Sequence, residues 1–359
     1  MEDINNHERI EEGLDFYSEI TSPEKASHLG EALIGLISEQ YNLSNLRFLE
    51  KVDKGYMSEN SILESEGKKF FLKKHRTVDY GIVSTTLNVE QFFADKGIPA
   101  ILPIPFGNNE TMFQTEDGMY SLYPFVEGSH GHRMHYSKTA LKSAAEMLAK
   151  IHIAGQKDYP SVVYDDFVMW TKEEFLAKAT SVKELIKPET DFDRMALKYL
   201  ELKIKVVTET DEFPFEKNFG APQLIHGDYH GSNIFFDDKE QVTHVFDFEK
   251  AQIQPSVLEV VRSINFLCFG GEFSEDQFES AEHFLRCYEA IIPVDRDYLR
   301  NAIWFWHFRQ AYSLWEHTEH YEKNNARVDD LVEKRYGYLK YYSENIETHV
   351  EKIMNRISK

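Results

Sequence analysis

Residues 224–249 read LIHGDYHGSNIFFDDKEQVTHVFDFE, and this stretch decides the fold. A His-Gly-Asp tripeptide ends at Asp228, Asn233 follows five positions later, and Asp247 opens an Asp-Phe-Glu tripeptide fourteen positions after that. Two short apolar runs separated by an acidic turn lie between the last two residues, which is the pattern of a β-hairpin. A hairpin here brings Asn233 and Asp247 to the same end of the pair of strands.

These three side chains suit phosphoryl transfer from a nucleotide. That reaction needs a carboxylate to orient the accepting hydroxyl and hard oxygen ligands for Mg²⁺. Asp228, on a loop before the hairpin, is placed to accept the proton of the hydroxyl, and Asn233 and Asp247 offer the oxygen ligands. The order and spacing match the H-R-D-x-x-x-x-N and D-F-G motifs of protein kinases. Two unrelated turns are the alternative, and the combination of motifs disfavours it.

The same residues resemble a known family. The run from His226 through Asp228 to Asn233, followed by Asp247-Phe-Glu, is similar to the aminoglycoside phosphotransferase and choline kinase-like family, whose members are small-molecule kinases of the protein-kinase-like fold. The resemblance implies that Asp228 is the catalytic base and that Asn233 and Asp247 bind Mg²⁺.

Two further segments support the resemblance. Leu148-Ala-Lys-Ile-His152 resembles a Leu-Ala-x-x-His helix of the family. Glu259 stands where many members have an aspartate that supports the catalytic loop, which is a departure from the pattern.

The resemblance also implies that the N-terminal half holds ATP or GTP. Residues 54–60 fit the phosphate-covering loop, where backbone N–H groups, Ser58 and Asn60 would contact phosphates. The loop has one glycine, so by itself it reads as an ordinary hairpin turn. Lys73, which ends a predicted strand, is expected to pair with the phosphates, and Lys74 is its competitor.

Two more nucleotide-side assignments follow. Glu90, on a predicted helix, is either the partner of that lysine or a solvated helix residue. The segment 121–128 resembles the interlobe hinge, whose backbone would bind the base. The side chains of Tyr123, Phe125 and Val126 are expected in the core or the pocket wall.

The distribution of periodic segments predicts an α+β, bilobal, protein-kinase-like fold with a small antiparallel sheet and a larger helical lobe. We expect one domain over 1–126, with an N-terminal helical extension and a nucleotide-binding, β-rich lobe, and a helical catalytic and acceptor-binding domain over 127–359. The first has predicted strands at 46–52, 61–64, 69–73, 111–115 and 119–125 and helices at 25–41 and 83–96. The second has predicted helices at 137–155, 166–181, 190–210, 256–269, 275–290, 296–320 and 327–357, with strands only within 223–248.

Composition limits the possible partners. The 359 residues carry a formal net charge of −21, which argues against a nucleic-acid partner and against an anionic membrane surface. No run reaches the roughly 20 apolar residues of a membrane span, the N-terminus does not read as a signal peptide, and two cysteines cannot build a disulfide framework. A cytoplasmic location is expected, and the sequence leaves the oligomeric state open.

The acceptor is not identified by the sequence. An aminoglycoside, an amino alcohol, homoserine and a sugar all remain candidates, and the acidic charge slightly favours a cationic one. The aromatic segment 302–320 is predicted to be a core helix, with a substrate-contacting wall of Trp306, Arg309 and Tyr312 as the alternative.

Two other functions compete with a small-molecule kinase. A catalytically silent kinase-like protein that serves as a structural or interaction module is one of them, and the glycine-poor loop favours it. A protein kinase is the other, and it ranks low because no Ala-Pro-Glu segment or long activation loop follows Asp247.

Overall fold

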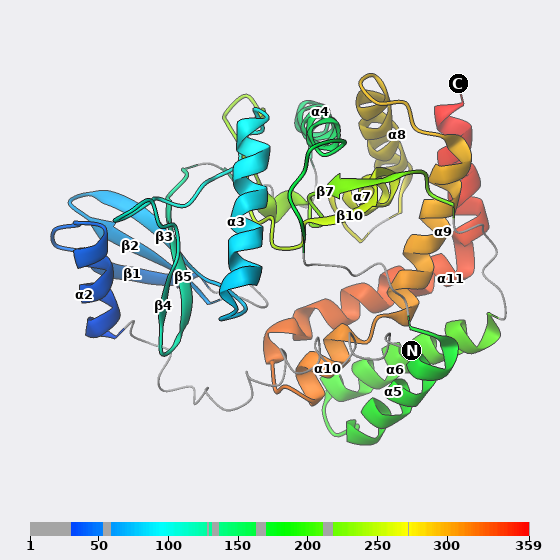
Figure 1. Cartoon of the computed structure of the whole chain (residues 1–359). Coiled ribbons are helices and arrows are strands. Elements are labelled where there is room, and N and C mark those ends of the chain that lie inside the picture. Colours follow the sequence, from blue (N-terminus) through cyan, green and yellow to red (C-terminus); the bar gives the residue numbers. More distant parts are fainter. Residues whose placement is uncertain are drawn as a thin grey trace, which may run out of the picture. The chain divides into compact units, whose positions relative to one another are not determined.

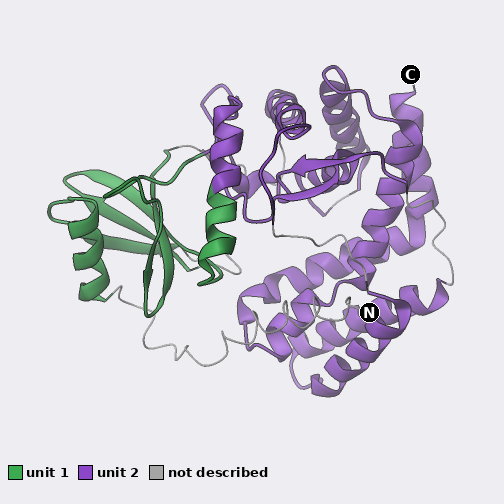
Figure 2. Ribbon diagram, viewed as in Figure 1, with its two compact units in different colours: residues 1–87, 101–127 green, residues 88–100, 128–359 purple. Residues whose placement is uncertain are grey.

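The computed structural model describes residues 30–52, 59–127, 129–130, 136–162, 170–210, 218–271 and 273–358. The chain divides into two compact units, shown in Figure 2: residues 1–87 with 101–127, and residues 88–100 with 128–359. Helix α3 (Tyr80–Asp95) contributes its first half to the smaller unit and its second half to the larger one.

An antiparallel sheet of five strands, in the order β1-β2-β3-β5-β4, forms the smaller unit (Figure 1). Its strands are β1 Arg47–Val52, β2 Asn60–Ser65, β3 Lys68–Lys74, β4 Phe113–Thr115 and β5 Gly118–Pro124. Glu66 and Gly67 both have positive φ, which is the conformation that a two-residue hairpin turn between β2 and β3 requires. Helix α2 (Glu31–Gln40) packs Ile37 among buried side chains of the sheet, including Leu63 and Leu72. The predicted small antiparallel sheet is confirmed.

The larger unit contains two small sets of strands. The hairpin predicted after Asn233 is present as β8 (Ile234–Phe236) and β9 (Val242–Val245), and β6 (Ser129–His130) pairs with β8. Strand β7 (Pro222–Ile225) pairs antiparallel with β10 (Gln252–Pro255). These two sets flank the loop that carries Asp228.

Helices make up most of the larger unit (Figure 1), which confirms the α+β class. They are α4 Lys138–Ala154, α5 Lys172–Leu185, α6 Asp191–Glu209, α7 Ser256–Ile264, α8 Glu275–Glu289, α9 Arg296–Tyr312, α10 Trp315–Tyr321 and α11 Asp329–Ile357. A π-helical turn, Asn265–Phe269, continues α7. No helix in these described parts of the chain is long and apolar enough to cross a membrane.

Two predicted features of the larger unit are wrong. The helix expected over 296–320 is broken at Ser313, whose backbone is extended, and α10 begins two residues later. The buried ammonium of Lys203 donates a hydrogen bond to the Ser313 carbonyl. The backbone carbonyl at the break therefore has a hydrogen-bond partner inside the core. Because the helix is broken here, Trp315 does not lie on the same helix face as Trp304 and Phe308. Strand β10 was also not predicted, because its Gln-Ile-Gln-Pro sequence carries little strand signal.

Candidate active site

The loop that follows β7 holds Asp228 in a buried position. The carbonyl of Gly155, at the end of α4, accepts a hydrogen bond from the backbone N–H of Leu224 at 3.0 Å. This bond fixes the position of β7 against α4. Further along, the Tyr229 hydroxyl donates to the Ala144 carbonyl at 2.9 Å, and the Ser263 hydroxyl donates to the Tyr229 carbonyl at 3.0 Å. Helices α4 and α7 thus fix both ends of the turn.

His226 shapes this turn from inside. The backbone N–H of Asp228 donates to Nδ1 of His226 at 3.2 Å, so the ring proton sits on Nε2, which donates to the Phe246 carbonyl at 3.0 Å. Burial lowers the pKa of His226, in keeping with the neutral ring that this pattern needs. His226 therefore links the Asp228 turn to the residue that precedes Asp247.

Glu259 supports the same turn from α7. Its carboxylate accepts the backbone N–H of His226 at 3.1 Å and the ring N–H of His152 at 3.0 Å, and Tyr229 N–H lies 3.5 Å away. Burial opposes ionisation of Glu259, but the hydrogen bond from His152 and the nearby charge of Arg262 help to hold its pKa below the ordinary value. Glutamate in place of the family's aspartate therefore keeps the supporting contacts.

The two predicted metal ligands are tied to Asp228 and to each other. The side-chain N–H₂ of Asn233 donates to the Asp228 carbonyl at 2.9 Å, so this contact uses the amide nitrogen and not the amide oxygen. The backbone N–H of Phe246 donates to the Asn233 carbonyl at 2.9 Å, directly before Asp247. Asp247 has a φ of 65°, a left-handed conformation that is uncommon for aspartate and typical of functional positions.

An amide oxygen and a carboxylate at one end of a hairpin fit Mg²⁺, which takes few protein ligands and keeps phosphate and water oxygens. Among the described residues, no group of three or more His, Cys, Asp and Glu side chains is arranged to hold a metal. A site built on Asn233 and Asp247 does not require such a group.

Two cationic side chains and the ring of His230 contact the Asp228 carboxylate. Arg262 of α7 forms an ion pair with Oδ1, His230 Nε2 lies 3.5 Å from the same oxygen, and Lys250 Nζ lies 3.2 Å from Oδ2. Burial alone would raise the pKa of Asp228, but Lys250, Arg262 and His230 outweigh it and hold the pKa well below the usual range. Asp228 is therefore ionised, and it is a weak base suited to orienting a hydroxyl.

The contacts of Arg262 and Lys250 with Asp228 were not among the features predicted from the sequence. Arg262 follows Glu259 by three positions in α7, and residues three apart share a helix face. That spacing was the signal that could have placed Arg262 beside the turn that Glu259 supports. Lys250 directly follows Asp-Phe-Glu, where its role could not be told from that of a surface lysine.

The residues predicted to contact the nucleotide lie mostly on the small sheet. Lys73 and Asn60 are direct cross-strand partners on β3 and β2, so their side chains share a face, and Lys73 is 2% exposed. Lys74 pairs with Glu59 at 3.2 Å instead. Glu90 is fully buried on α3, in the part of that helix that belongs to the larger unit.

The predicted hinge side chains differ in burial. Tyr123 is fully buried on β5, while Phe125 and Val126 are half-buried and Lys69 lies over the Phe125 ring at 5.3 Å. Ser58 and most of the predicted phosphate loop lie outside the described residues.

The fold and the site together define a phosphotransferase of the protein-kinase-like fold. A sequence model described as "Phosphotransferase enzyme family" matches residues 49–292, and the chain belongs to that family. The chain is 23% identical over 293 residues to a homoserine kinase of Caulobacter vibrioides, covering 79% of this chain and 83% of the relative. A homoserine kinase of a second Caulobacter species is also 23% identical, over 286 residues, covering 78% and 82%.

Solved structures show the same fold at low sequence identity. Spectinomycin phosphotransferase APH(9)-Ia, in complex with ADP and spectinomycin, superposes with a TM-score of 0.61 at 16% identity, covering 91% of this chain and 99% of its own. A microcompartment-associated aminopropanol kinase superposes with a TM-score of 0.60 at 13% identity, covering 90% and 98%. The predicted family and fold class are confirmed.

Proposed function

We propose that this protein transfers the γ-phosphoryl group of ATP to a hydroxyl group of a small-molecule acceptor. The acceptor oxygen attacks the γ-phosphorus, the bond from that phosphorus to the β,γ-bridging oxygen breaks, and ADP leaves. The hydroxyl proton passes to Asp228 and from there to water. The relatives support an acceptor of this kind, since their names are those of kinases for homoserine, spectinomycin and aminopropanol.

One observation carries this proposal: the Asn233 amide holds the Asp228 carbonyl while the Asn233 backbone holds Phe246, next to Asp247. The three residues of the motif are thereby fixed as one unit of the larger part of the chain. We assign Asp228 to orient the hydroxyl and accept its proton, and Asn233 and Asp247 to hold Mg²⁺. The metal, when bound, neutralises phosphate charge that develops during transfer.

The weak basicity of Asp228 suits this reaction. Phosphoryl transfer passes through a loose transition state in most analyses, so the hydroxyl needs positioning more than early deprotonation. On the nucleotide side, Lys73 is proposed to pair with phosphates, and Asn60, Ser58 and Glu90 are proposed to assist. The backbone around Tyr123, Phe125 and Val126 is proposed to bind the base, which leaves GTP as an alternative donor. We also retain the cytoplasm as the proposed location.

The test is ADP release in the presence of Mg²⁺, measured over aminoglycosides, amino alcohols, homoserine and sugars, and repeated with GTP. We expect release that depends on one acceptor class and that falls about 10²- to 10⁴-fold in Asp228→Asn, the range for loss of a general acid or base. Nucleotide binding by Asp228→Asn should persist. Nucleotide binding without release on any acceptor would support the catalytically silent alternative, and absence of nucleotide binding would refute the kinase function.

A further inference from the structure

Both oxygens of the Asp228 carboxylate are engaged by cations of the chain itself. Arg262 and His230 contact Oδ1, and Lys250 contacts Oδ2. An acceptor hydroxyl that is to be oriented by Asp228 therefore competes with these side chains for the carboxylate oxygens. A cation removed from its counter-ion in a largely buried site is costly unless another anion meets it.

Arg262 is the cation best built to exchange partners. Its side chain is 16% exposed, and its guanidinium lies 5.0 Å from the centre of the Phe266 ring. The Arg262 Nε–H is buried and makes no hydrogen bond within the described part of the chain. A guanidinium binds a carboxylate through two parallel N–H bonds, so Arg262 has donor capacity beyond the Asp228 contact.

A second unused donor lies beside Phe266, the ring against which the Arg262 guanidinium packs. Trp306, on α9, packs edge-on against Phe266 with ring centres 6.0 Å apart, and Trp306 is 7% exposed. Its indole N–H is also buried without a hydrogen-bond partner among the residues described. Buried donors left unpaired cost about 1–3 kcal/mol each, so an acceptor atom supplied by a ligand at this site would be favourable.

The π-helical turn Asn265–Phe269 creates this arrangement. It follows α7 directly and leaves Phe266 40% exposed, between Arg262, Trp306 and the ring of His230, which lies 5.3 Å away. Single π-helical turns in helices are frequent at functional sites.

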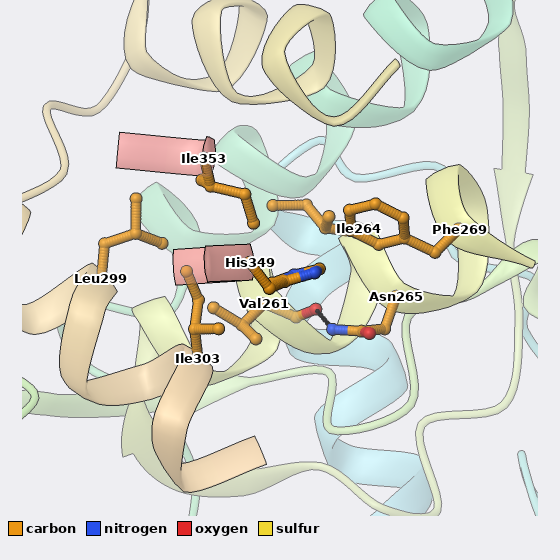
Figure 3. A pocket seen from close by; sticks show the side chains of 8 residues that line it. All are labelled: Val261, Ile264, Asn265, Phe269, Leu299, Ile303, His349 and Ile353. Carbon is orange, nitrogen blue, oxygen red and sulfur yellow. Dashed lines mark hydrogen bonds between the residues drawn. The ribbon is translucent and has the colours of Figure 1, made fainter. Parts of the chain in front are cut away.

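Other side chains of α7 and the π-helical turn face away into the core. Val261, Ile264 and Asn265 line a closed cavity of about 10 Å³ beside His349 (Figure 3). That volume holds at most about one water molecule. This cavity is too small for an acceptor, whereas Arg262 lies on the side of α7 that contacts Asp228.

We propose that the acceptor hydroxyl compound carries a carboxylate group, and that Arg262, assisted by the Trp306 indole, binds it. This inference rests on the proposed kinase function and names its substrate class. Binding of the carboxylate draws Arg262 from Asp228, so that His230 alone still contacts Oδ1 and the hydroxyl can approach that oxygen. The Arg262 guanidinium thus favours an anionic group at this position, against the cationic preference that the net charge of −21 suggested.

Three compounds separate the two charges of a hydroxy amino acid. L-Homoserine carries a carboxylate and an amine, 4-hydroxybutyrate only the carboxylate, and 3-amino-1-propanol only the amine. We expect kcat/KM of the wild-type protein to be higher for the two carboxylates. Arg262→Gln should lower kcat/KM for both by about 100-fold, through KM, since a charge-assisted pair contributes that much. Its effect on kcat/KM for 3-amino-1-propanol, which reports the general disturbance of Asp228 when its Arg262 partner is lost, should be clearly smaller, so that the preference for the two carboxylates falls.

Two further variants complete the design. Arg262→Lys, which keeps the charge without the fork, should recover part of the loss, and Arg286→Gln, an exposed arginine of α8, should behave as wild type. Circular dichroism and thermal unfolding establish that each variant is folded. Binding of 4-hydroxybutyrate to the Mg-ADP complex, measured by calorimetry, gives a second readout that needs no turnover.

Several results would overturn the proposal. They are a wild-type preference for 3-amino-1-propanol, an equal loss on all three compounds in Arg262→Gln, or an effect of that variant confined to the KM for ATP, which would assign Arg262 to nucleotide phosphate. Failure of both carboxylates to bind or react, while another acceptor reacts, would overturn it too. Failure to bind nucleotide or to phosphorylate any acceptor would instead reject the kinase function itself.

Discussion

His152 and Glu259, 107 residues apart in the sequence, form a 3.0 Å hydrogen bond in which neither side chain is exposed to solvent. The Tyr288 hydroxyl engages the other ring nitrogen of His152 at 2.7 Å. Because Glu259 also accepts the backbone N–H of His226, this buried chain connects α4 and α8 to the turn before Asp228.

Glu259→Gln should destabilise the protein and slow its reaction. The amide oxygen can still accept from His226 and His152, but the amide N–H₂ then faces the Tyr229 N–H and the negative charge is lost. Loss of a buried charged partner costs about 2–4 kcal/mol in the free energy of unfolding. Urea unfolding and ADP release would measure the two effects. Glu282→Gln, which removes a partly exposed ion pair of α8, should cost less than about 1 kcal/mol. Equal losses in the two variants would contradict a supporting role for Glu259.

Asp247→Asn should weaken binding of the metal–nucleotide complex. Asparagine tolerates the left-handed backbone of position 247, so the substitution removes a charge without adding strain. We expect at least about tenfold weaker binding of a nonhydrolysable ATP analogue with Mg²⁺, and a smaller change without it. Asp238 is an exposed residue in the turn between β8 and β9, and Asp238→Asn is the matched control. A loss independent of Mg²⁺ would argue against Asp247 as a metal ligand.

Gly155→Ala should disrupt the support of β7. An added Cβ would lie 2.0 Å from the Leu224 carbonyl oxygen, so the strand that leads to Asp228 must move. We expect a loss of several kcal/mol in stability, of the size of other overpacking mutations or more, and a lower kcat. Gly337→Ala, inside α11, meets nothing within 4 Å and should raise the free energy of unfolding by up to about 1 kcal/mol. Thermal unfolding of both variants gives the comparison, and a neutral Gly155→Ala would show that β7 is not tightly packed there.

Acid stability should depend on Glu316, which is buried between two cations. Arg335 forms an ion pair with it at 2.5 Å and Lys203 Nζ lies 3.5 Å away. Burial would raise the pKa of Glu316, but these two cations lower it to about 2. The unfolded chain keeps an ordinary value near 4.5, so this contribution to stability is complete above pH 4.5 and is lost as the pH falls towards 2.

Glu316→Gln should therefore cost about 3–5 kcal/mol at pH 7, because it removes the charge that faces the buried Lys203 and the partly exposed Arg335. The difference from wild type should shrink between pH 4.5 and 2, measured by urea unfolding at each pH. Asp191→Asn, which removes an exposed ion pair, should show no such pH-dependent difference. A constant difference across the pH range would mean that Glu316 is not ionised in the folded protein.

The sequence predicted the parts of the site that are local. Asp228, Asn233 and Asp247 lie within one turn and one hairpin, and hairpins are visible as apolar runs around a polar turn. It did not predict that Arg262 covers Asp228, because that contact depends on how α7 packs against the loop after β7. The break at Ser313 was not predicted for the same reason. The Ser313 carbonyl accepts a hydrogen bond from Lys203, which lies on α6 and is distant in the sequence.

The anchors of the Asp228 turn also have a consequence for how the protein is made. Its supports include the Ala144 carbonyl, 85 residues before Tyr229, and Glu259, 33 residues after His226. During synthesis, domains form as the chain emerges from the ribosome. All three motif residues are therefore synthesised before their scaffold is complete, and a nascent chain that stops short of α7 holds the motif without its geometry.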